Sequence, residues 1–119
     1  MPRNILLAFA STAVLLSAAA YGHAKLQSSS PADHAQLTVA PITLSLTFNE
    51  SAKLAKLTLK GSTKEIPVTL DHDAKSATTV TVTLPTLSPD TYEVQWTAMA
   101  VEDGHITKGT LTFTVSKSP

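Results

Sequence analysis

One short segment of the sequence, Asp103-Gly104-His105, has residue types and a spacing that can bind a metal ion. In an extended chain, residues two apart point to the same side, so the Asp103 carboxylate and the His105 imidazole can converge on one ion. Gly104 between them lets the backbone turn sharply. The same three residues also fit an ordinary hairpin, because Asp-Gly is a frequent turn dipeptide. Taken alone, the spacing favours the turn.

His23 adds a second source of ligands if the mature chain begins there. An N-terminal histidine offers an imidazole nitrogen and its α-amine, whose ordinary pKa is about 8, so a metal ion can displace the amine proton. With Asp103 and His105, it would complete a set of three nitrogens and one oxygen. Such a set suits tetragonal Cu(II), which has the highest affinity among divalent first-row ions. The alternative is that His23 merely lies near a cleavage site.

Other candidate ligands have simpler interpretations. Glu50 follows a predicted strand and can serve as a weak ligand or an outer acceptor, although a solvated carboxylate is the more common case at a strand end. Asp71-His72-Asp73 lies in a polar stretch where such residues are common, and we interpret it as a surface loop. His34 falls in a turn and is assigned to the surface. Met99 alone supplies too few thioethers for a Cu(I) site.

Residues 1–22 have the features of an export signal. A single basic residue precedes an apolar run at residues 5–16, and small residues follow, which is the order of the regions of a secretory signal. The run is shorter than the roughly 20 apolar residues that a membrane-spanning helix needs. Small residues permit cleavage before His23 or before Lys25. We therefore expect a periplasmic domain at residues 23–119, without stable membrane insertion after cleavage.

The elements that must position these residues are predicted to be strands. Threonine or serine alternates with apolar residues in three runs, at residues 42–48, 79–84 and 110–115. A period of two is typical of half-buried antiparallel strands, and proline and glycine separate the runs. About seven short strands without helical periodicity predict an all-β sandwich or barrel. The remaining predicted strands cover residues 25–28, 54–60, 66–70 and 92–98, with Trp96 on the core side.

The composition excludes several classes of protein. The absence of cysteine excludes a disulfide scaffold, a thiolate zinc site and a cysteine nucleophile. Nine basic and nine acidic residues give a formal net charge of zero, which argues against binding nucleic acid through a basic face. The sequence has no nucleophile elbow, phosphate loop or His-Glu-x-x-His motif. We therefore expect a protein that is not an enzyme.

In their order and spacing, the motifs resemble the CopC family of periplasmic copper-resistance proteins, including its YobA-like members. The segments that carry the resemblance are HAKLQSSSPADHAQL, PITLSLTFNE and LSPDTYEVQWTAMAVEDGHITKGTLTFTV. Each motif is weak alone, but together they cover essentially the whole chain after the signal. The resemblance implies a small Greek-key β-barrel or sandwich, cupredoxin- or immunoglobulin-like, and cleavage before His23.

The resemblance also implies a Cu(II) site made by His23, Asp103 and His105, while Glu50 matches a glutamate found beside the site in some members. It implies a non-enzymatic carrier that works with an inner-membrane copper transport partner of the CopD type. The Met-rich Cu(I) site of some members is not carried over, because this sequence lacks the methionine cluster. The prediction is a periplasmic Cu(II)-binding protein for copper homeostasis or resistance.

Two alternative functions remain open. A histidine-brace copper oxidase would use the same N-terminal histidine and His105. Against it, the chain is short for a flat substrate-binding face, and Asp103 would fill the position that oxygen chemistry needs open. A metal-free β-sandwich for adhesion or assembly would use Asp103-Gly104-His105 only as a turn, and His23 would be incidental.

Overall fold

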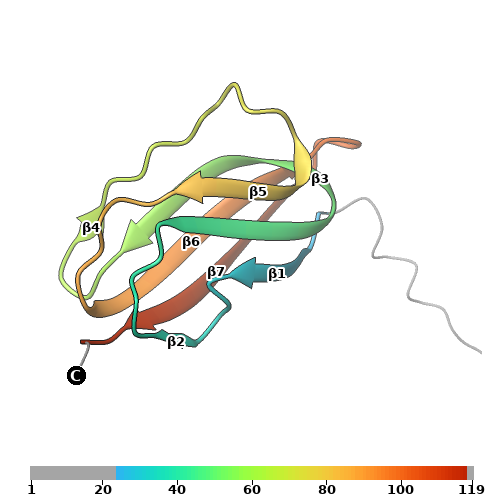
Figure 1. The fold of residues 1–119 in the computed structure, drawn as a ribbon. Helices are drawn as coiled ribbons and strands as arrows, with labels where there is room; N and C mark the ends of the chain where they lie inside the picture. Colours follow the sequence, from blue (N-terminus) through green and yellow to red (C-terminus); the bar gives the residue numbers. More distant parts are fainter. Residues whose placement is uncertain (1–23, 118–119) are drawn as a thin grey trace, which may run out of the picture.

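The computed structural model describes residues 24–117, in which all regular structure is β-strand. The strands pair into one sheet that curls over to form a two-layered sandwich (Figure 1). This confirms the predicted all-β fold. Residues 24–117 thus contain no helix long and apolar enough to cross a membrane. The seven strands are β1 (Leu26–Ser30), β2 (Ala35–Leu37), β3 (Thr43–Lys60), β4 (Glu65–Ile66), β5 (Ala77–Thr83), β6 (Asp90–Ala100) and β7 (Ile106–Val115).

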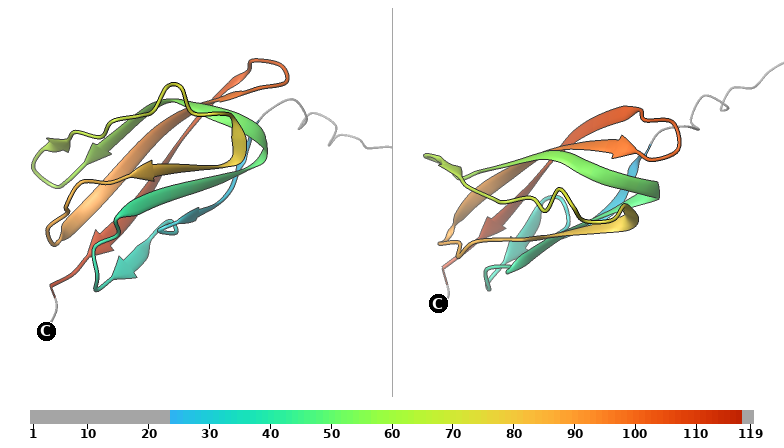
Figure 2. Two further views of the ribbon diagram at one scale, coloured as in Figure 1. Left: turned by 45° about the horizontal axis from the view of Figure 1, so that its top comes forward. Right: turned by 90° about the horizontal axis from the view of Figure 1, so that it is seen from above.

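The long strand β3 connects the two layers. Its first half pairs with β1 and β5, and its second half pairs with β4 and β6. Ala52, near its middle, pairs with Ala77 of β5 and with Ala100 of β6. Figure 2 shows β3 curving out of one layer and into the other. A shift of register between Leu54 and Lys56 has the form of a β-bulge, which bends a strand locally.

The core lies between the two layers and is built from the apolar residues of the alternating runs. Tyr92 stacks on Phe113 and Trp96 meets Phe48 edge to face, each pair with ring centroids 5.4 Å apart. Trp96 is 5% exposed, which confirms its predicted place in the core. The Tyr92 hydroxyl donates a hydrogen bond to the carbonyl of Ser88 and so fixes the turn into β6. The two aromatic pairs join β3 to β6 and β6 to β7 within the core.

Three details differ from the prediction. Residues 42–48 and 54–60 are not separate strands but belong largely to β3, because the residues between them begin the ladder with β6. The predicted strand at residues 66–70 shrinks to β4, because Pro67 has no N–H group to donate to a ladder. Strand β2 was not predicted, since three residues are too few to show a period, and it pairs in parallel with β7.

Gly109 of β7 lies opposite Trp96 of β6, and the two are in close contact. A Cβ atom added to Gly109 would lie 2.4 Å from Cζ2 and 2.7 Å from Cε2 of the indole. Gly109→Ala is therefore expected to lower the free energy of unfolding by about 1–3 kcal/mol, the usual cost of overpacking a core. Urea denaturation measures this loss. Adding Trp96→Phe, with its smaller ring, should recover part of it, whereas strictly additive losses would contradict the clash.

Candidate metal centre

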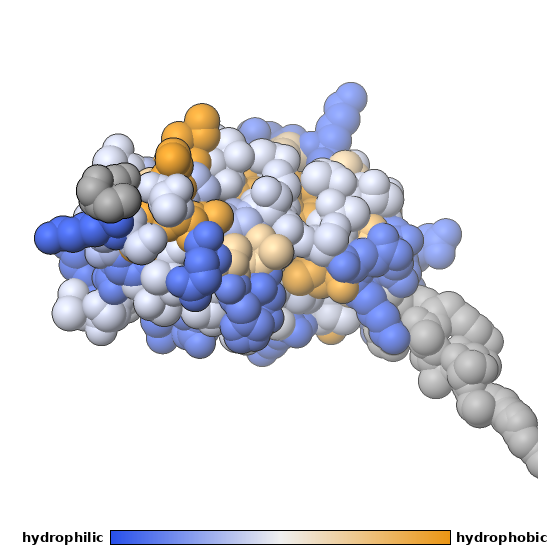
Figure 3. Space-filling view, turned by 60° about the horizontal axis from the view of Figure 1, so that its bottom comes forward, coloured by the Kyte–Doolittle hydropathy of each residue, from blue (hydrophilic) through white to orange (hydrophobic). Residues whose placement is uncertain are grey.

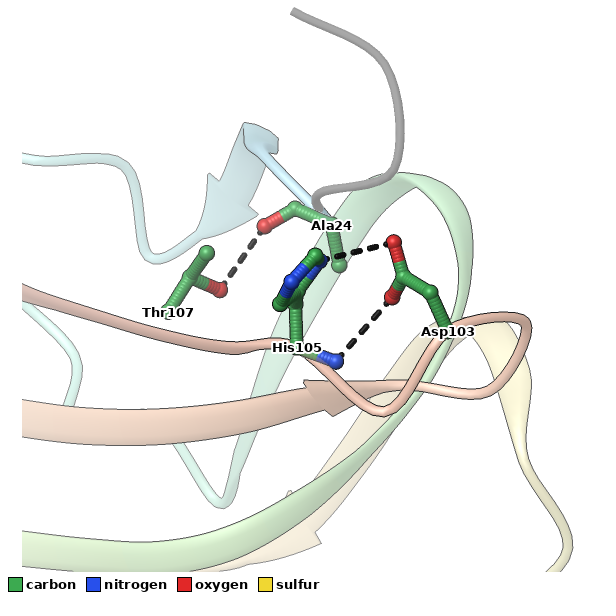
Figure 4. Close-up of polar contacts among 4 residues, drawn as sticks. All are labelled: Ala24, Asp103, His105 and Thr107. Atoms are coloured by element: carbon green, nitrogen blue, oxygen red, sulfur yellow. Dashed lines mark hydrogen bonds and ion pairs between the residues drawn. The ribbon is translucent and has the colours of Figure 1, made fainter.

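The β6–β7 connection forms a tight turn that carries Asp103 and His105 (Figure 4). The Ala100 amide donates to the His105 carbonyl, and the Gly104 amide donates to the Ala100 carbonyl, both at 2.9 Å. Gly104 has a φ of +72°, in the left-handed region that glycine adopts without strain. The hairpin interpretation of this segment is therefore confirmed, and the turn also brings the two side chains of interest together.

Asp103 and His105 are joined by two contacts. The His105 amide donates to Asp103 Oδ1 at 3.0 Å, and His105 Nδ1 lies 2.9 Å from Asp103 Oδ2. A carboxylate only accepts, so this contact places a proton on Nδ1, and the neutral ring then carries its lone pair on Nε2. The His105 side chain is 59% exposed and that of Asp103 is 28% exposed. The pair therefore presents an oriented imidazole at the protein surface.

The start of the described chain lies beside this turn. The Thr107 hydroxyl donates to the Ala24 carbonyl at 2.8 Å, and Ala24 itself is fully buried. The next residue, Lys25, exchanges two hydrogen bonds with Asn49 of β3: its amide donates to Asn49 Oδ1 at 2.7 Å, and its carbonyl accepts from the Asn49 amide at 3.0 Å. Figure 4 shows Ala24 and Thr107 next to the Asp103–His105 pair.

The predicted ligands are distributed as follows. Asp103 and His105 come together, whereas His23 lies outside the described residues. Glu50 is half-buried within β3, not at a strand end, because β3 continues to Lys60. Among residues 24–117, no three histidine, aspartate or glutamate side chains come close enough to hold one ion. Within that part of the chain, Glu50 therefore does not form a ligand group with the pair.

The other polar candidates lie on the surface, as expected. Asp71 accepts from the Asp73 amide at 3.0 Å in an exposed turn, and His72 in the same turn is also exposed. The His34 side chain is 83% exposed and lies 3.4 Å from its neighbour Asp33. These contacts are local to each loop. The interpretation of both segments as surface loops is confirmed.

Apolar side chains also surround the turn. Met99, Val101 and Ile106 are 38%, 51% and 50% exposed, and Met99 pairs with Ile106 across β6 and β7. The face seen in Figure 3 carries hydrophilic residues over much of its area and hydrophobic residues in smaller areas. Away from the turn, Val39 and Ile42 are 77% and 78% exposed. The end of the sandwich that carries the Asp103–His105 pair is therefore exposed and partly apolar.

Sequence reasoning did not find Asn49 and Thr107. They contact residues 24 and 25 only because β3 and β7 bring distant segments together, at separations of 24 and 83 residues. Asparagine at a strand position is unusual, which is a weak signal. Threonine is common in these strands, so nothing in the sequence distinguishes Thr107 from the others.

These observations define a small β-sandwich with an Asp–His hairpin beside the start of its first strand. Residues 26–116 match the family model of the CopC domain. Protein YobA of Escherichia coli strain K12 is 34% identical over 110 residues, which cover 87% of each chain. The chain belongs to the CopC family.

Solved structures have the same fold. CopC from Methylosinus trichosporium OB3b has a TM-score of 0.69 and 24% identity, and the match covers 82% of this chain and 97% of that one. PcoC, a methionine-rich copper resistance protein from Escherichia coli, has a TM-score of 0.62 and 29% identity, and the match covers 80% of this chain and all of PcoC. The sandwich described above is thus the fold of these proteins.

Proposed function

We propose that this protein is a periplasmic carrier that binds one Cu(II) ion for copper homeostasis or resistance and catalyses no reaction. Residues 1–22 direct export and are removed. The mature chain then binds Cu(II) through the α-amine and imidazole of His23, the imidazole of His105 and the Asp103 carboxylate. Copper is the cargo of the protein.

Membership of the CopC family supports the copper-related part of this function. PcoC from Escherichia coli is described as a copper resistance protein. PcoC is also described as methionine-rich, whereas this chain has two methionines, Met1 and Met99. Thioether sulfur suits Cu(I), and imidazole nitrogen suits Cu(II). The donors available here therefore favour Cu(II).

The position of Ala24 is the observation that carries the proposed site. The Cα atom of any residue bonded to Ala24 lies about 3.8 Å from the Ala24 Cα atom. Ala24 is held by Thr107, two residues after His105, so a residue bonded to the Ala24 amide nitrogen would start near the Asp103–His105 pair. The amine and the imidazole of His23 would then be available on the side of Nε2 of His105. This juxtaposition would supply the three nitrogens.

Asp103 would do two things at this site. Its bond to Nδ1 orients the His105 ring so that Nε2 is the nitrogen that binds the metal, as acceptors behind metal-bound histidines commonly do. Its carboxylate also brings a negative charge to the divalent cation. Glu50, one residue after Asn49, would add to the negative potential from outside the ligand set.

The burial of Ala24 also favours cleavage before His23 over cleavage before Lys25. Cleavage before Lys25 would remove the fully buried Ala24 side chain and the carbonyl that accepts from Thr107. Cleavage before His23 leaves both contacts intact. The domain at residues 23–119 is therefore the form that keeps every contact described for residues 24 and 25.

An inner-membrane copper transport partner of the CopD type fits this arrangement. The His105 side chain is 59% exposed, so a partner can reach the ion without opening the fold. The apolar side chains of Met99, Val101 and Ile106 surround the turn and offer area for a transient contact. We propose that copper is handed over at this end of the sandwich.

A Cu(II) titration of protein purified from the periplasm tests the proposed function. The intact mass should correspond to a chain that starts at His23, and binding should saturate at one Cu(II) ion per chain. Electron paramagnetic resonance (EPR) should give an axial signal with coupling to three nitrogens. A chain that starts at Lys25, or the absence of binding, would overturn the proposed site.

The titration should also depend on pH. The affinity is expected to fall as the pH drops from about 8 to about 5, because α-amines with an ordinary pKa of about 8 and imidazoles of about 6.5 must lose protons to bind copper. With a reductant and oxygen, the copper-loaded protein should consume no more oxygen than its apo form. Sustained consumption that depends on His23 would favour the histidine-brace oxidase instead.

A further inference from the structure

Residues 24 and 25 each bond to a side chain, and Lys25 also accepts a backbone bond from the Asn49 amide, although the ladder of β1 begins only at Leu26. Strand β1 starts at Leu26, so Ala24 and Lys25 precede it. The Thr107 hydroxyl and the Asn49 side chain provide a bond to each of them, at 2.8 and 2.7 Å. The two side chains come from β7 and β3, and together they fix the chain on both sides.

The two contacts differ in burial, and this decides which one matters more. The bond from Thr107 to the Ala24 carbonyl is partly buried, whereas the bond from the Lys25 amide to Asn49 is exposed. Water competes less with a partly buried hydrogen bond than with an exposed one. Removing the Thr107 hydroxyl leaves the Ala24 carbonyl without that donor. Thr107 also stands two residues from His105 on a continuous backbone. It therefore links the position of Ala24 to that of the His105 imidazole.

From this geometry we infer that Thr107, assisted by Asn49, is a positioning residue for the metal site, holding the mature N-terminus at a fixed distance from His105. The inference rests on the proposed function and explains how a chain terminus serves as a ligand. A free terminus samples many conformations, and ordering a residue costs conformational entropy. A terminus already fixed at Ala24 avoids most of that cost when copper binds.

Thr107→Val tests the inference, because valine has nearly the same shape and lacks the hydroxyl. The variant is expected to raise the Kd for Cu(II) by about three- to tenfold, the effect of losing one partly buried hydrogen bond. Its EPR signal should broaden or shift, since the amine and imidazole of His23 would adopt more than one arrangement. Thr107→Ser keeps the hydroxyl and should restore both the Kd and the signal.

Thr114→Val is the matched control. Thr114 lies on the same strand, and its hydroxyl meets that of Thr91 at 3.2 Å, far along β7 from the turn. This variant also removes a cross-strand hydroxyl contact and should leave the Kd unchanged. Thermal unfolding of the apo proteins compares their stabilities, so that a general loss of stability is separated from a local one.

The Asn49 contact has its own test in the apo protein. Asn49→Ala should speed hydrogen exchange at the Lys25 amide, which donates to the Asn49 side chain, and should raise the Kd less than Thr107→Val does. If the wild-type protein binds copper and Thr107→Val matches it in Kd and EPR signal, the inference is overturned and the proposed function stands. If the wild-type protein binds no copper, both are overturned.

Discussion

Inserting one glycine ahead of His23 is expected to weaken Cu(II) binding by about 10²–10⁴-fold, although every side chain of the domain is retained. The added residue moves the α-amine away from His23 by about 3.8 Å and turns the His23 nitrogen into an amide. The amine and imidazole then no longer chelate from one residue, and the loss of a tethered second ligand carries an effect of this size. Titration against a competing chelator measures the change.

A glycine added after Pro119 is the control for the insertion, because it lengthens the chain by the same residue at the other terminus. Its affinity should equal that of the wild-type protein. The EPR signal of the N-terminal insertion should show fewer coupled nitrogens, whereas that of the control should not change. If the insertion variant keeps the wild-type affinity and EPR signal, the N-terminal amine is not a ligand of the copper ion.

Much of the fold was predictable because the core depends on local alternation. Most apolar residues at alternate positions of the three threonine-rich runs are buried, as in Leu44, Leu46 and Phe48, each at most 1% exposed. Ile42 continues that period but is 78% exposed, because it precedes the first paired residue of β3. Period alone therefore identifies the buried face of a strand but does not say where pairing begins.

Long-range features were not predictable in the same way. Nothing in the sequence near Glu50 shows that β3 continues past it and changes layers, since that depends on pairing with β5 and β6. Asp103-Gly104-His105 was recognisable from its spacing. The contact of Thr107 with Ala24 was not, because it spans 83 residues and involves a common residue type. The site thus combines a local motif, visible in the sequence, with a position that only the fold supplies.

The second large effect is expected at His105, and it separates the loss of this nitrogen ligand from a change at Asp103, which would both orient the ring and supply an oxygen. His105→Ala should weaken Cu(II) binding by about 10²-fold or more and remove one coupled nitrogen from the EPR signal, since an imidazole ligand is lost. His72→Ala is the matched control, because His72 lies in an exposed turn between β4 and β5. An unchanged Kd in His105→Ala would show that His105 is not a ligand. An equal loss of Cu(II) affinity in His72→Ala would indicate a site in the loop at residues 71–73.

Asp103→Asn completes this comparison. Asparagine keeps the shape and one acceptor oxygen but cannot accept from both the His105 amide and Nδ1 as the carboxylate does at 3.0 and 2.9 Å. We expect a loss of about 10- to 100-fold, the range found for partners behind a metal-bound histidine. The number of coupled nitrogens should stay the same, because the imidazole is still present. If the EPR signal of Asp103→Asn shows one coupled nitrogen fewer, the turn no longer holds His105 in place. If the variant binds Cu(II) with the wild-type Kd, neither the orienting contact nor the charge of Asp103 is needed.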